Sequence, residues 1–327
     1  MQLEKLEELV SRFQQKEKSA LARLISLIEN EPEMASAVFN RLNSPQQPSY
    51  ILGITGPPGA GKSSLINQLV EKLTAQGKSV GVISIDPSSP FTGGAFLGDR
   101  IRMSSAVQHE LCFMRSMASR GSVGGLSRAT FDTCLLMEAF GFEIIIIETV
   151  GAGQSEVEVL KFADTILVLN VPGLGDSIQC QKAGIMEIGD ILVVNKKDLG
   201  GEEIAVQLDL MLDDAVMFIG ESGWRPPVVQ TNSISGEGFD ELVEEIWNHK
   251  EHITLSGELE EKRRTRMKDK LMDVIRYRIE DYILKEIYPK IESSVMDQIT
   301  ENKYTVYGIA GTIYETFLSH QKGSEKK

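Results

Sequence analysis

One eight-residue string restricts the fold more than any other part of the sequence. It has the pattern Gly-x-x-x-x-Gly-Lys-Ser and consists of Gly56, Pro57, Pro58, Gly59, Ala60, Gly61, Lys62 and Ser63, with Ser64 next in the chain. The apolar run Ile51–Thr55 precedes it and the amphipathic stretch SSLINQLVEKL follows it. Glycine-rich turns between a strand and a helix wrap phosphates with backbone N–H groups, and the helix N-terminus attracts their charge. The string therefore predicts a phosphate-binding loop in which Lys62 contacts the β- and γ-phosphates.

Short apolar runs alternate with amphipathic stretches through the middle of the chain. The runs are Ile51–Thr55, Ser79–Ile85, Glu143–Ile147, Thr165–Val171, Ile191–Asn195 and Pro227–Thr231. Strands that are apolar on both faces are typical of a parallel sheet covered by helices on each side. We therefore predict an α/β fold with a doubly wound, mostly parallel sheet flanked by helices, and place this domain at residues 46–252.

The start of the chain shows helical spacing. Apolar residues recur at helical intervals through Leu3–Ile28, and a second short helix is expected over Met34–Leu42. The proline-containing segment Ser44–Pro48 is typical of a linker. These features predict an N-terminal helical extension at residues 1–45.

Helical spacing returns near the end of the chain. A stripe of apolar residues marks Met267–Ile287, and further helical stretches are expected at residues 291–301 and 307–318. Two or three helices do not easily bury a core of their own. We therefore expect residues 253–327 to form a C-terminal helical arm that joins two copies in a homodimer.

The run Ile191–Asn195 leads into a second motif, with the pattern Asn-Lys-x-Asp. A carboxylate at its last position accepts two hydrogen bonds from the N1–H and exocyclic NH₂ of guanine, which adenine does not offer. One strand later comes a loop whose backbone N–H groups are expected to face guanine O6. The corresponding loop of GTPases usually contains Ser-Ala, whereas this sequence contains Asn-Ser, a difference that leaves backbone contacts intact. The predicted guanine site consists of Asn195, Lys196, Asp198, Asn232, Ser233 and Ile234.

Acidic residues end two of the expected strands. Asp86 closes one and Glu148 closes another, while Asp99 follows in the string Gly-Asp-Arg. Side chains at the carboxyl edge of a parallel sheet point into the ligand crevice, and oxygen ligands suit Mg²⁺. We expect Ser63, Asp86, Asp99 and Glu148 to form a magnesium site, and Lys62, Glu148 and Asp86 to be the catalytic residues.

The segment that begins at Glu148 resembles the Asp-x-x-Gly switch of GTPases, with Glu in place of Asp. The residue after Gly151 is Ala152, where Ras-like proteins have a glutamine that positions the attacking water. Gln154 comes two positions later. Since no evident water-activating residue stands at the expected place, intrinsic hydrolysis is expected to be slow and to depend on a partner.

Charge and composition exclude several kinds of partner. The sequence has 34 Lys and Arg against 47 Asp and Glu, a net charge of −13, which disfavours nucleic acid and anionic membranes. Its charged, helical start does not resemble a signal peptide, and its apolar runs, such as Ile144–Ile147, are too short to cross a membrane. A soluble, cytoplasmic protein is expected. Cys112, Cys134 and Cys180 are widely spaced, so we expect buried thiols rather than disulfides or zinc ligands.

Several long strings together resemble the MeaB/ArgK family of GTPases, relatives of the human methylmalonic aciduria type A protein. They are GITGPPGAGKSSLI, ISIDPSSPFTGGAFLGDRIRM, RGSVGGLSRAT, ETVGAGQSEVEV, NVPGLGDSIQCQKAGIMEIGD and NKKD, and the C-terminal string EKRRTRMKDKL with Tyr304–Gly311 adds to the likeness. The resemblance implies a P-loop NTPase fold of the SIMIBI class, a homodimer formed by the C-terminal helices, and GTP hydrolysis with Mg²⁺. It also implies a chaperone of an adenosylcobalamin-dependent acyl-CoA mutase, usually methylmalonyl-CoA mutase. Such a chaperone gates cofactor loading and protects or reactivates the enzyme.

The same resemblance implies roles in switching and partner coupling. The residues concerned are Arg102, Gly151, Gln154, Asp176, Gln179 and Lys182. Arg102 belongs to the first switch, and the last three lie in PGLGDSIQCQK, which resembles the additional switch that couples hydrolysis to the mutase. Ser122 stands where many relatives have histidine, a difference that concerns only partner contact.

Other functions share parts of this pattern. Metal-insertion GTPases carry Cys- or His-rich loading sequences, whereas the one close pair here, His249 and His252, is typical of a solvated surface pair. A kinase of amino-acid transport proteins, an older interpretation of the family, conflicts with guanine selectivity. A signal-recognition-type GTPase would bring a Met-rich or basic RNA-binding domain, and neither is present in the sequence. The metal-insertion chaperone and the transport kinase are kept as alternatives.

Overall fold

The structure is a computed structural model of the whole chain, which divides into two compact units, Met1–Arg263 and Arg264–Lys327. The residues that it describes are 3–43, 45, 47–87, 109–119, 123–149, 160–172, 188–219, 223–289, 291–292 and 305–324. The N-terminal helices belong to the same unit as the sheet. The three-part division at residues 45 and 252 stays a prediction.

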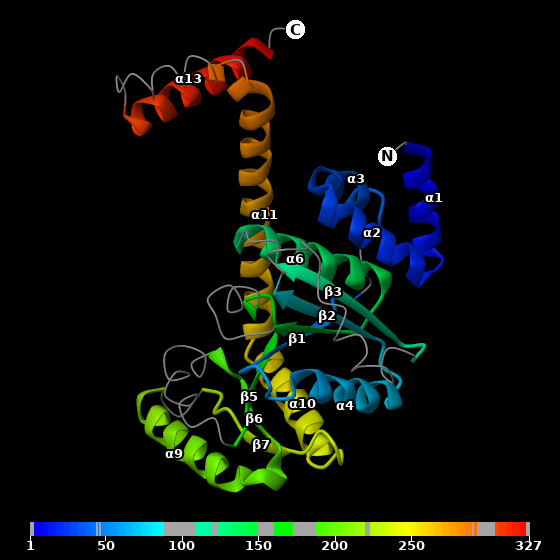
Figure 1. Cartoon of the computed structure of the whole chain (residues 1–327), viewed down its shortest axis with the longest axis vertical. Helices are drawn as coiled ribbons and strands as arrows, with labels where there is room; N and C mark the ends of the chain where they lie inside the picture. Colours follow the sequence, from blue (N-terminus) through cyan, green and yellow to red (C-terminus); the bar gives the residue numbers. More distant parts are fainter. Residues whose placement is uncertain are drawn as a thin grey trace. The chain divides into compact units, whose positions relative to one another are not determined.

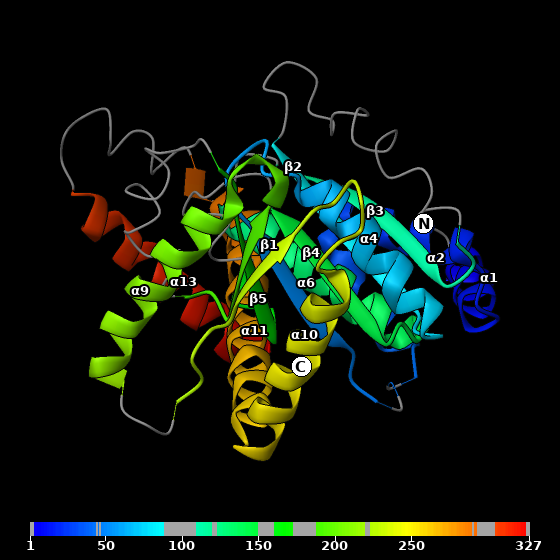
Figure 2. The same ribbon diagram turned by 90° about the horizontal axis from the view of Figure 1, so that it is seen from below.

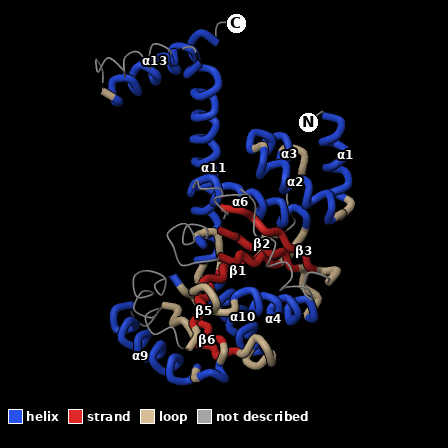
Figure 3. Tube along the Cα trace, viewed as in Figure 1, coloured by secondary structure: helices blue, strands red, loops and turns tan. Residues whose placement is uncertain are grey.

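A seven-stranded sheet forms the centre of the first unit (Figures 1 and 3). Its strands are β1 (Tyr50–Thr55), β2 (Val80–Pro87), β3 (Cys112–Ser119), β4 (Ile144–Thr149), β5 (Thr165–Asn170), β6 (Ile191–Asn195) and β7 (Val228–Thr231). They lie in the order β3-β2-β4-β1-β5-β6-β7, and every neighbouring pair is parallel. The predicted class, a doubly wound parallel sheet, is therefore confirmed.

Helices cover both faces of this sheet, which explains the continuous apolar runs. Along β1, Ile51 packs with one core cluster and the next residue, Leu52, packs with the other. Successive side chains of a strand point to opposite faces, so both positions must be apolar when both faces are covered. Helices α4 (Lys62–Ala75) and α10 (Phe239–Leu255) contact each other on one face (Figure 2).

The opposite face is covered by α6 (Val123–Phe140) together with the N-terminal helices α1 (Leu3–Gln14) and α2 (Lys18–Asn30). A short helical stretch follows, η1 (Pro32–Met34) and α3 (Ala35–Phe39). Towards β7, α9 (Gly201–Ile219) buries Ala205 and Leu208 against β5 and β6.

Three basic side chains among the described residues connect the N-terminal helices to the sheet domain: Lys16, Arg115 and Lys18, which donates to the carbonyls of Glu110 and Cys112, each at 2.7 Å. Lys16, in the left-handed turn between α1 and α2 with φ 66°, donates to the carbonyl of Phe140. A cation at this place also stabilises the C-terminal dipole of α6. Arg115 on β3 forms an ion pair with Glu29 of α2, with 2.7 Å between nitrogen and oxygen.

Strand β3 was not predicted. It lies at the edge of the sheet, and among its residues whose exposure is described only Cys112 and Met117 are buried. Its middle includes Arg115, so the strand has neither a continuous apolar run nor a regular alternation. The buried Cys112 and Cys134 confirm that prediction for two of the cysteines, whereas Cys180 lies outside the described residues.

Helices also make up the described residues of the second unit. Helix α11 (Glu258–Tyr282) begins in the first unit, runs on into the second and continues as a π-helical turn, η5 (Ile283–Ile287). Helix α13 (Val306–Ser324) follows, and Phe317 packs edge-on against Tyr282 with ring centroids 5.9 Å apart. None of the helices in the described ranges combines the length and the hydropathy that a bilayer crossing requires.

A chain of hydrogen-bonded polar side chains, all buried except the partly buried Asp190, lies at the edge of the sheet where the strands begin. The Tyr50 hydroxyl bonds to Thr165 Oγ1, which lies 2.7 Å from His249 Nδ1. His249 Nε2 lies 3.4 Å from Asp190 Oδ1, and the other Asp190 oxygen accepts from the backbone of Ile166. His249 is only 1% exposed, so its interpretation as half of a solvated surface pair is wrong. A neutral imidazole protonated at Nε2 satisfies both of its neighbours.

Burial shifts the pKa values of the two ionisable ends of this contact in opposite directions. It raises the pKa of Asp190 to about 6 and lowers the pKa of His249 to about 4. A carboxyl group with a raised folded pKa binds more protons in the folded state between its unfolded and folded pKa values. Asp190 therefore destabilises the fold progressively as pH rises from about 4 to about 6.

We predict that Asp190→Asn gains stability relative to the native chain as pH rises through this window. Its amide oxygen keeps the bond to Ile166 and the charge is gone, while its NH₂ group replaces the oxygen that faces His249 Nε2; that loss lowers the stability of the variant without following the titration of the carboxyl group. The expected gain between pH 4 and pH 7 is on the order of 2 kcal/mol. Urea unfolding at four pH values measures it, with the exposed Glu244→Gln on α10 as the control. A stability difference that does not change with pH would contradict the assignment.

Candidate functional site

The phosphate-binding motif forms the loop between β1 and α4, where β1 ends. Gly56, Gly59 and Gly61 have φ values of 149°, 78° and 91°, a region that favours glycine. A Cβ on Gly61 would lie 2.5 Å from Asn195 Nδ2, and one on Gly56 would lie 2.7 Å from the carbonyl oxygen of Leu169. Backbone conformation and close packing both require glycine here.

Lys62 and Ser63 begin α4 directly after this loop. The Lys62 ammonium is buried and donates to the carbonyls of Gly56 and Pro57, at 2.7 and 3.0 Å. The cation therefore lies across the loop, beside the N-terminal turn of α4. Ser64, in the same turn, is exposed.

Glu148 lies at the end of β4, next to α4. Its side chain is 4% exposed, with Ser63 Oγ 2.8 Å from one oxygen and Ser84 Oγ 3.0 Å from the other. Ser84 is the register partner of Glu148 on β2. Two hydroxyls and a carboxylate thus form a compact set of oxygen ligands, the type that Mg²⁺ prefers. In the described part of the chain no three His, Cys, Asp or Glu side chains gather as they would around a metal.

Ser84 was missed by sequence reasoning. It interrupts the apolar string Val82-Ile83-Ser84-Ile85, and a hydroxyl in a strand buried on both faces needs a polar partner. That interruption was the available signal. Asp86 lies two residues further along β2, where its backbone pairs with Ala118 of β3.

Asn195 joins the phosphate loop to the base-binding loops. Its side chain is 1% exposed, its Nδ2 donates to the carbonyl of Ala60 at 2.9 Å, and its Oδ1 accepts from the backbone and hydroxyl of Ser233, at 3.2 and 2.9 Å. Lys196, with φ 60°, adds a bond from Nζ to the carbonyl of Gly59 at 3.1 Å. The two predicted motifs are therefore brought together by direct hydrogen bonds.

Asp198 lies in the short helix η4 (Lys197–Leu199), and Asn232 holds its carboxylate. Asn232 Nδ2 donates to Asp198 Oδ1 at 2.9 Å, while Asn232 Oδ1 accepts from the backbone of Ile234 and Ser235. Ile234 itself is 92% exposed. The prediction gave Asn232 only a backbone role, whereas its side chain orients the carboxylate proposed to read guanine.

Some predicted residues fall outside the described residues or side chains. The side chain of Asp86 is one, and the others are Asp99, Arg102, Gly151, Gln154, Asp176, Gln179 and Lys182. Their roles stay predictions. The described members of the predicted site, from the phosphate loop, Glu148 and the two base-binding loops, gather where β1, β4, β6 and β7 end.

Known proteins resemble this chain over most of its length. A family model described as methylmalonyl Co-A mutase-associated GTPase MeaB matches residues 21–287. A Pyrococcus horikoshii protein named as a GTPase is 45% identical over 274 residues, covering 84% of this chain and 86% of its own length. The mitochondrial methylmalonic aciduria type A homolog of mouse is 31% identical over 303 residues, covering 86% of this chain and 72% of its own.

A solved structure has a similar fold. The crystal structure of a protein named LAO/AO transport system kinase has a TM-score of 0.67 and 25% sequence identity, and the match covers 96% of this chain and 97% of that one. Fold, loops and relatives together define a nucleotide-binding P-loop GTPase, an enzyme that hydrolyses GTP. Within that class, the chain belongs to the MeaB family of methylmalonyl-CoA mutase-associated GTPases.

We predict that Asp198→Asn loses guanine selectivity. The substituted amide cannot accept from both N1–H and NH₂ of guanine, although it retains an oxygen for Asn232. A charged hydrogen-bond pair of this kind contributes about 2 kcal/mol, so GTP affinity should fall roughly thirtyfold while ATP affinity stays the same. Competition against a fluorescent GDP analogue measures both. Asn232→Ala keeps the carboxylate and should lose less; unchanged discrimination in Asp198→Asn would refute the base assignment.

Proposed function

We propose that this GTPase is a chaperone of an adenosylcobalamin-dependent acyl-CoA mutase, with methylmalonyl-CoA mutase as the first candidate. In this role its nucleotide state gates cofactor loading and protects or reactivates the mutase. The match to a mutase-associated family over residues 21–287 is the observation that carries the proposal. The mouse relative, named for methylmalonic aciduria, supports the same class of client.

The nucleotide is proposed to lie along the carboxyl edge of the sheet, with its phosphates in the loop Gly56–Gly61 and guanine against Asp198. The bonds from Asn195 to Ala60 and Ser233 support this placement, because they fix the phosphate loop and the base loop to one side chain. A single ligand then spans both motifs.

Magnesium is proposed to bind at Ser63 and Glu148, with Asp86 and Asp99 added from the sequence. The contact of 2.8 Å between Ser63 Oγ and Glu148 supports the fit, since hydroxyl and carboxylate oxygens are hard ligands that already face each other. When bound, the ion would neutralise charge on the β- and γ-phosphates. Lys62 would leave its loop carbonyls to share that charge.

We further propose that hydrolysis by the protein alone is slow. Ala152 follows Gly151 in the sequence, so the glutamine of Ras-like proteins has no counterpart there. The partner would complete the site through the switch residues Arg102, Gln154 and Asp176, together with Gln179 and Lys182.

A homodimer is proposed for the C-terminal unit. Large apolar side chains along α11 are exposed in the single chain: Met267, Leu271, Met272, Ile275 and Ile279. Surfaces of this kind are typical of protein interfaces. The cytoplasmic location stays a prediction from the sequence.

The alternatives are less well supported. A metal-insertion chaperone needs soft or imidazole ligands. The close histidine pair considered for that role includes His249, which is buried and contacts Thr165 and Asp190. A role as a transport kinase is suggested by the name of the solved relative, but a guanine-selective site does not suit an ATP-dependent kinase.

Steady-state hydrolysis of GTP and ATP, with and without a purified adenosylcobalamin-dependent mutase, tests the proposal. We expect slow, GTP-selective turnover that rises when the client mutase is added. Lys62→Ala should lose turnover by a factor of at least about 100, because the phosphate charge loses its cation, while its fold is kept. A panel of mutases that leaves turnover unchanged would refute the chaperone proposal, and ATP preference would refute the nucleotide assignment.

A further inference from the structure

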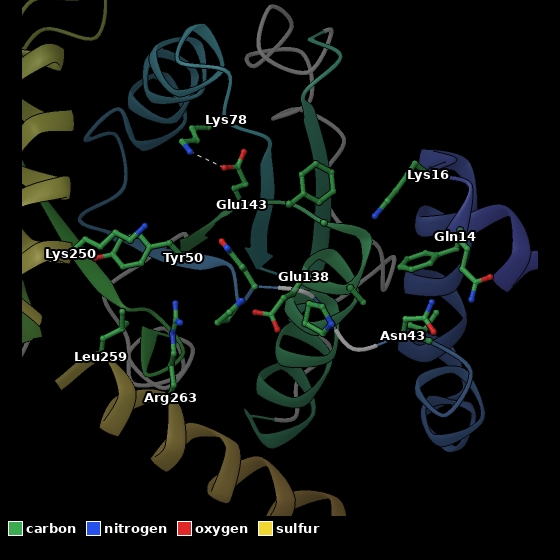
Figure 4. A pocket seen from close by; sticks show the side chains of 18 of the residues that line it. Gln14, Lys16, Asn43, Tyr50, Lys78, Glu138, Glu143, Lys250, Leu259 and Arg263 are labelled. Atoms are coloured by element: carbon green, nitrogen blue, oxygen red, sulfur yellow. Dashed lines mark hydrogen bonds and ion pairs between the residues drawn. The ribbon is translucent and has the colours of Figure 1, made fainter. Parts of the chain in front are cut away.

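A second cavity lies at the opposite edge of the sheet from the phosphate loop. Its volume is about 890 Å³, and it follows the edge where β1 and β4 begin, from α10 and the start of α11 to the end of α1 and the segment that leads into β1 (Figure 4). The lining residues that matter here are Tyr50, Lys78, Glu143, Lys250, Leu259 and Arg263. A volume of this size holds a metabolite-sized ligand.

Lys250 is the unusual side chain of this cavity. Its ammonium lies 4.9 Å from the ring centre of Tyr50 and 5.1 Å from that of Trp247. Across the described residues, no carboxylate or carbonyl oxygen lies within hydrogen-bonding distance of Lys250 Nζ. Aromatic faces stabilise a cation only partly. No anion among the described residues completes the stabilisation of this half-buried charge.

The other charged groups of the cavity already have partners. Lys78 pairs with Glu143 at 2.8 Å, and Arg263 contacts the carbonyl of Ser49 at 3.0 Å and Asp164 at 3.4 Å. Glu138 accepts from the backbone of Ser49, and Lys16 donates to Phe140. Glu143 and Asp164 attract the Lys250 ammonium from a distance without bonding to it.

The charges of Lys78 and Arg263 act on Lys250 more strongly than those of Asp164 and Glu143. The pKa of Lys250 is lowered, first by burial and then by the charges of these two cations. Two neighbouring cations and partial burial thus destabilise the charged form. A multiply charged anion would relieve this repulsion and supply the missing partner.

We propose that this cavity binds a small, multiply charged anion, a phosphorylated or polycarboxylate metabolite, with its anionic group at Lys250 between Lys78 and Arg263. The ring of Tyr50 lines the cavity beside that group, and the Lys250 ammonium also lies over the ring of Trp247. The site is separate from the nucleotide site, since Lys62 begins α4 and Lys78 follows the opposite end of that helix.

Calorimetric titration of the full chain, saturated with GDP so that the phosphate loop is filled, tests the proposal. The probes are pyrophosphate and citrate at constant ionic strength, which distinguish a phosphate ligand from a carboxylate ligand. Lys250→Met keeps the stem over Tyr50 and Trp247 and removes the charge. It should weaken binding at least tenfold, the loss expected for one charged hydrogen bond.

Glu143→Gln changes the charge of the same cavity in the opposite direction and should raise its affinity for the anion. A gain in affinity cannot result from a folding defect. The substitution removes a competing carboxylate, so we expect binding to become several-fold tighter. Lys5→Met, on the exposed face of α1, should leave affinity unchanged. The proposal is overturned if neither probe binds the GDP-saturated chain, or if Lys250→Met binds as tightly as the native protein.

Discussion

The side-chain amide of Asn195 holds the nucleotide end of the sheet together. Its nitrogen binds the phosphate loop at Ala60, and its oxygen binds the base loop at Ser233. It is 1% exposed, so a mismatch at either end would leave a buried polar atom without a partner. The close approach also requires Gly61 to lack a side chain. Loop geometry on both sides of the site therefore depends on one amide group.

This junction exists because the sheet is parallel. In a parallel sheet all strands end at one edge, so residues that follow β1, β4, β6 and β7 meet although the chain separates them widely. Lys62, Glu148, Asn195 and Ser233 each follow or end a different strand. The helices on both faces keep the strands buried and leave that edge to the ligand.

Much of this could be predicted from the sequence, because the motifs combine residue type with position relative to a strand. The class of the sheet and the convergence of the two nucleotide motifs are of this kind. The edge strand β3 was missed, since its partly buried middle includes the polar pair Arg115 and Ser116, which interrupts the apolar signal. The Asn232–Asp198 bond and the burial of His249 depend on contacts between distant segments, and local sequence patterns do not contain them.

The charges at the far edge of the sheet separate into two groups with different physical roles. Helices present partial negative charge at their C-termini, and nearby cations offset it. Lys16 does this at the end of α6, and Lys78, which follows α4, is in addition tied to Glu143. Both cations therefore stabilise the fold. Lys250 lies within α10, away from its last residues, and burial and its neighbours act against its charge. The chain contains 47 Asp and Glu residues, yet among the described residues no carboxylate bonds to Lys250 Nζ. This favours an anion that comes from outside the chain.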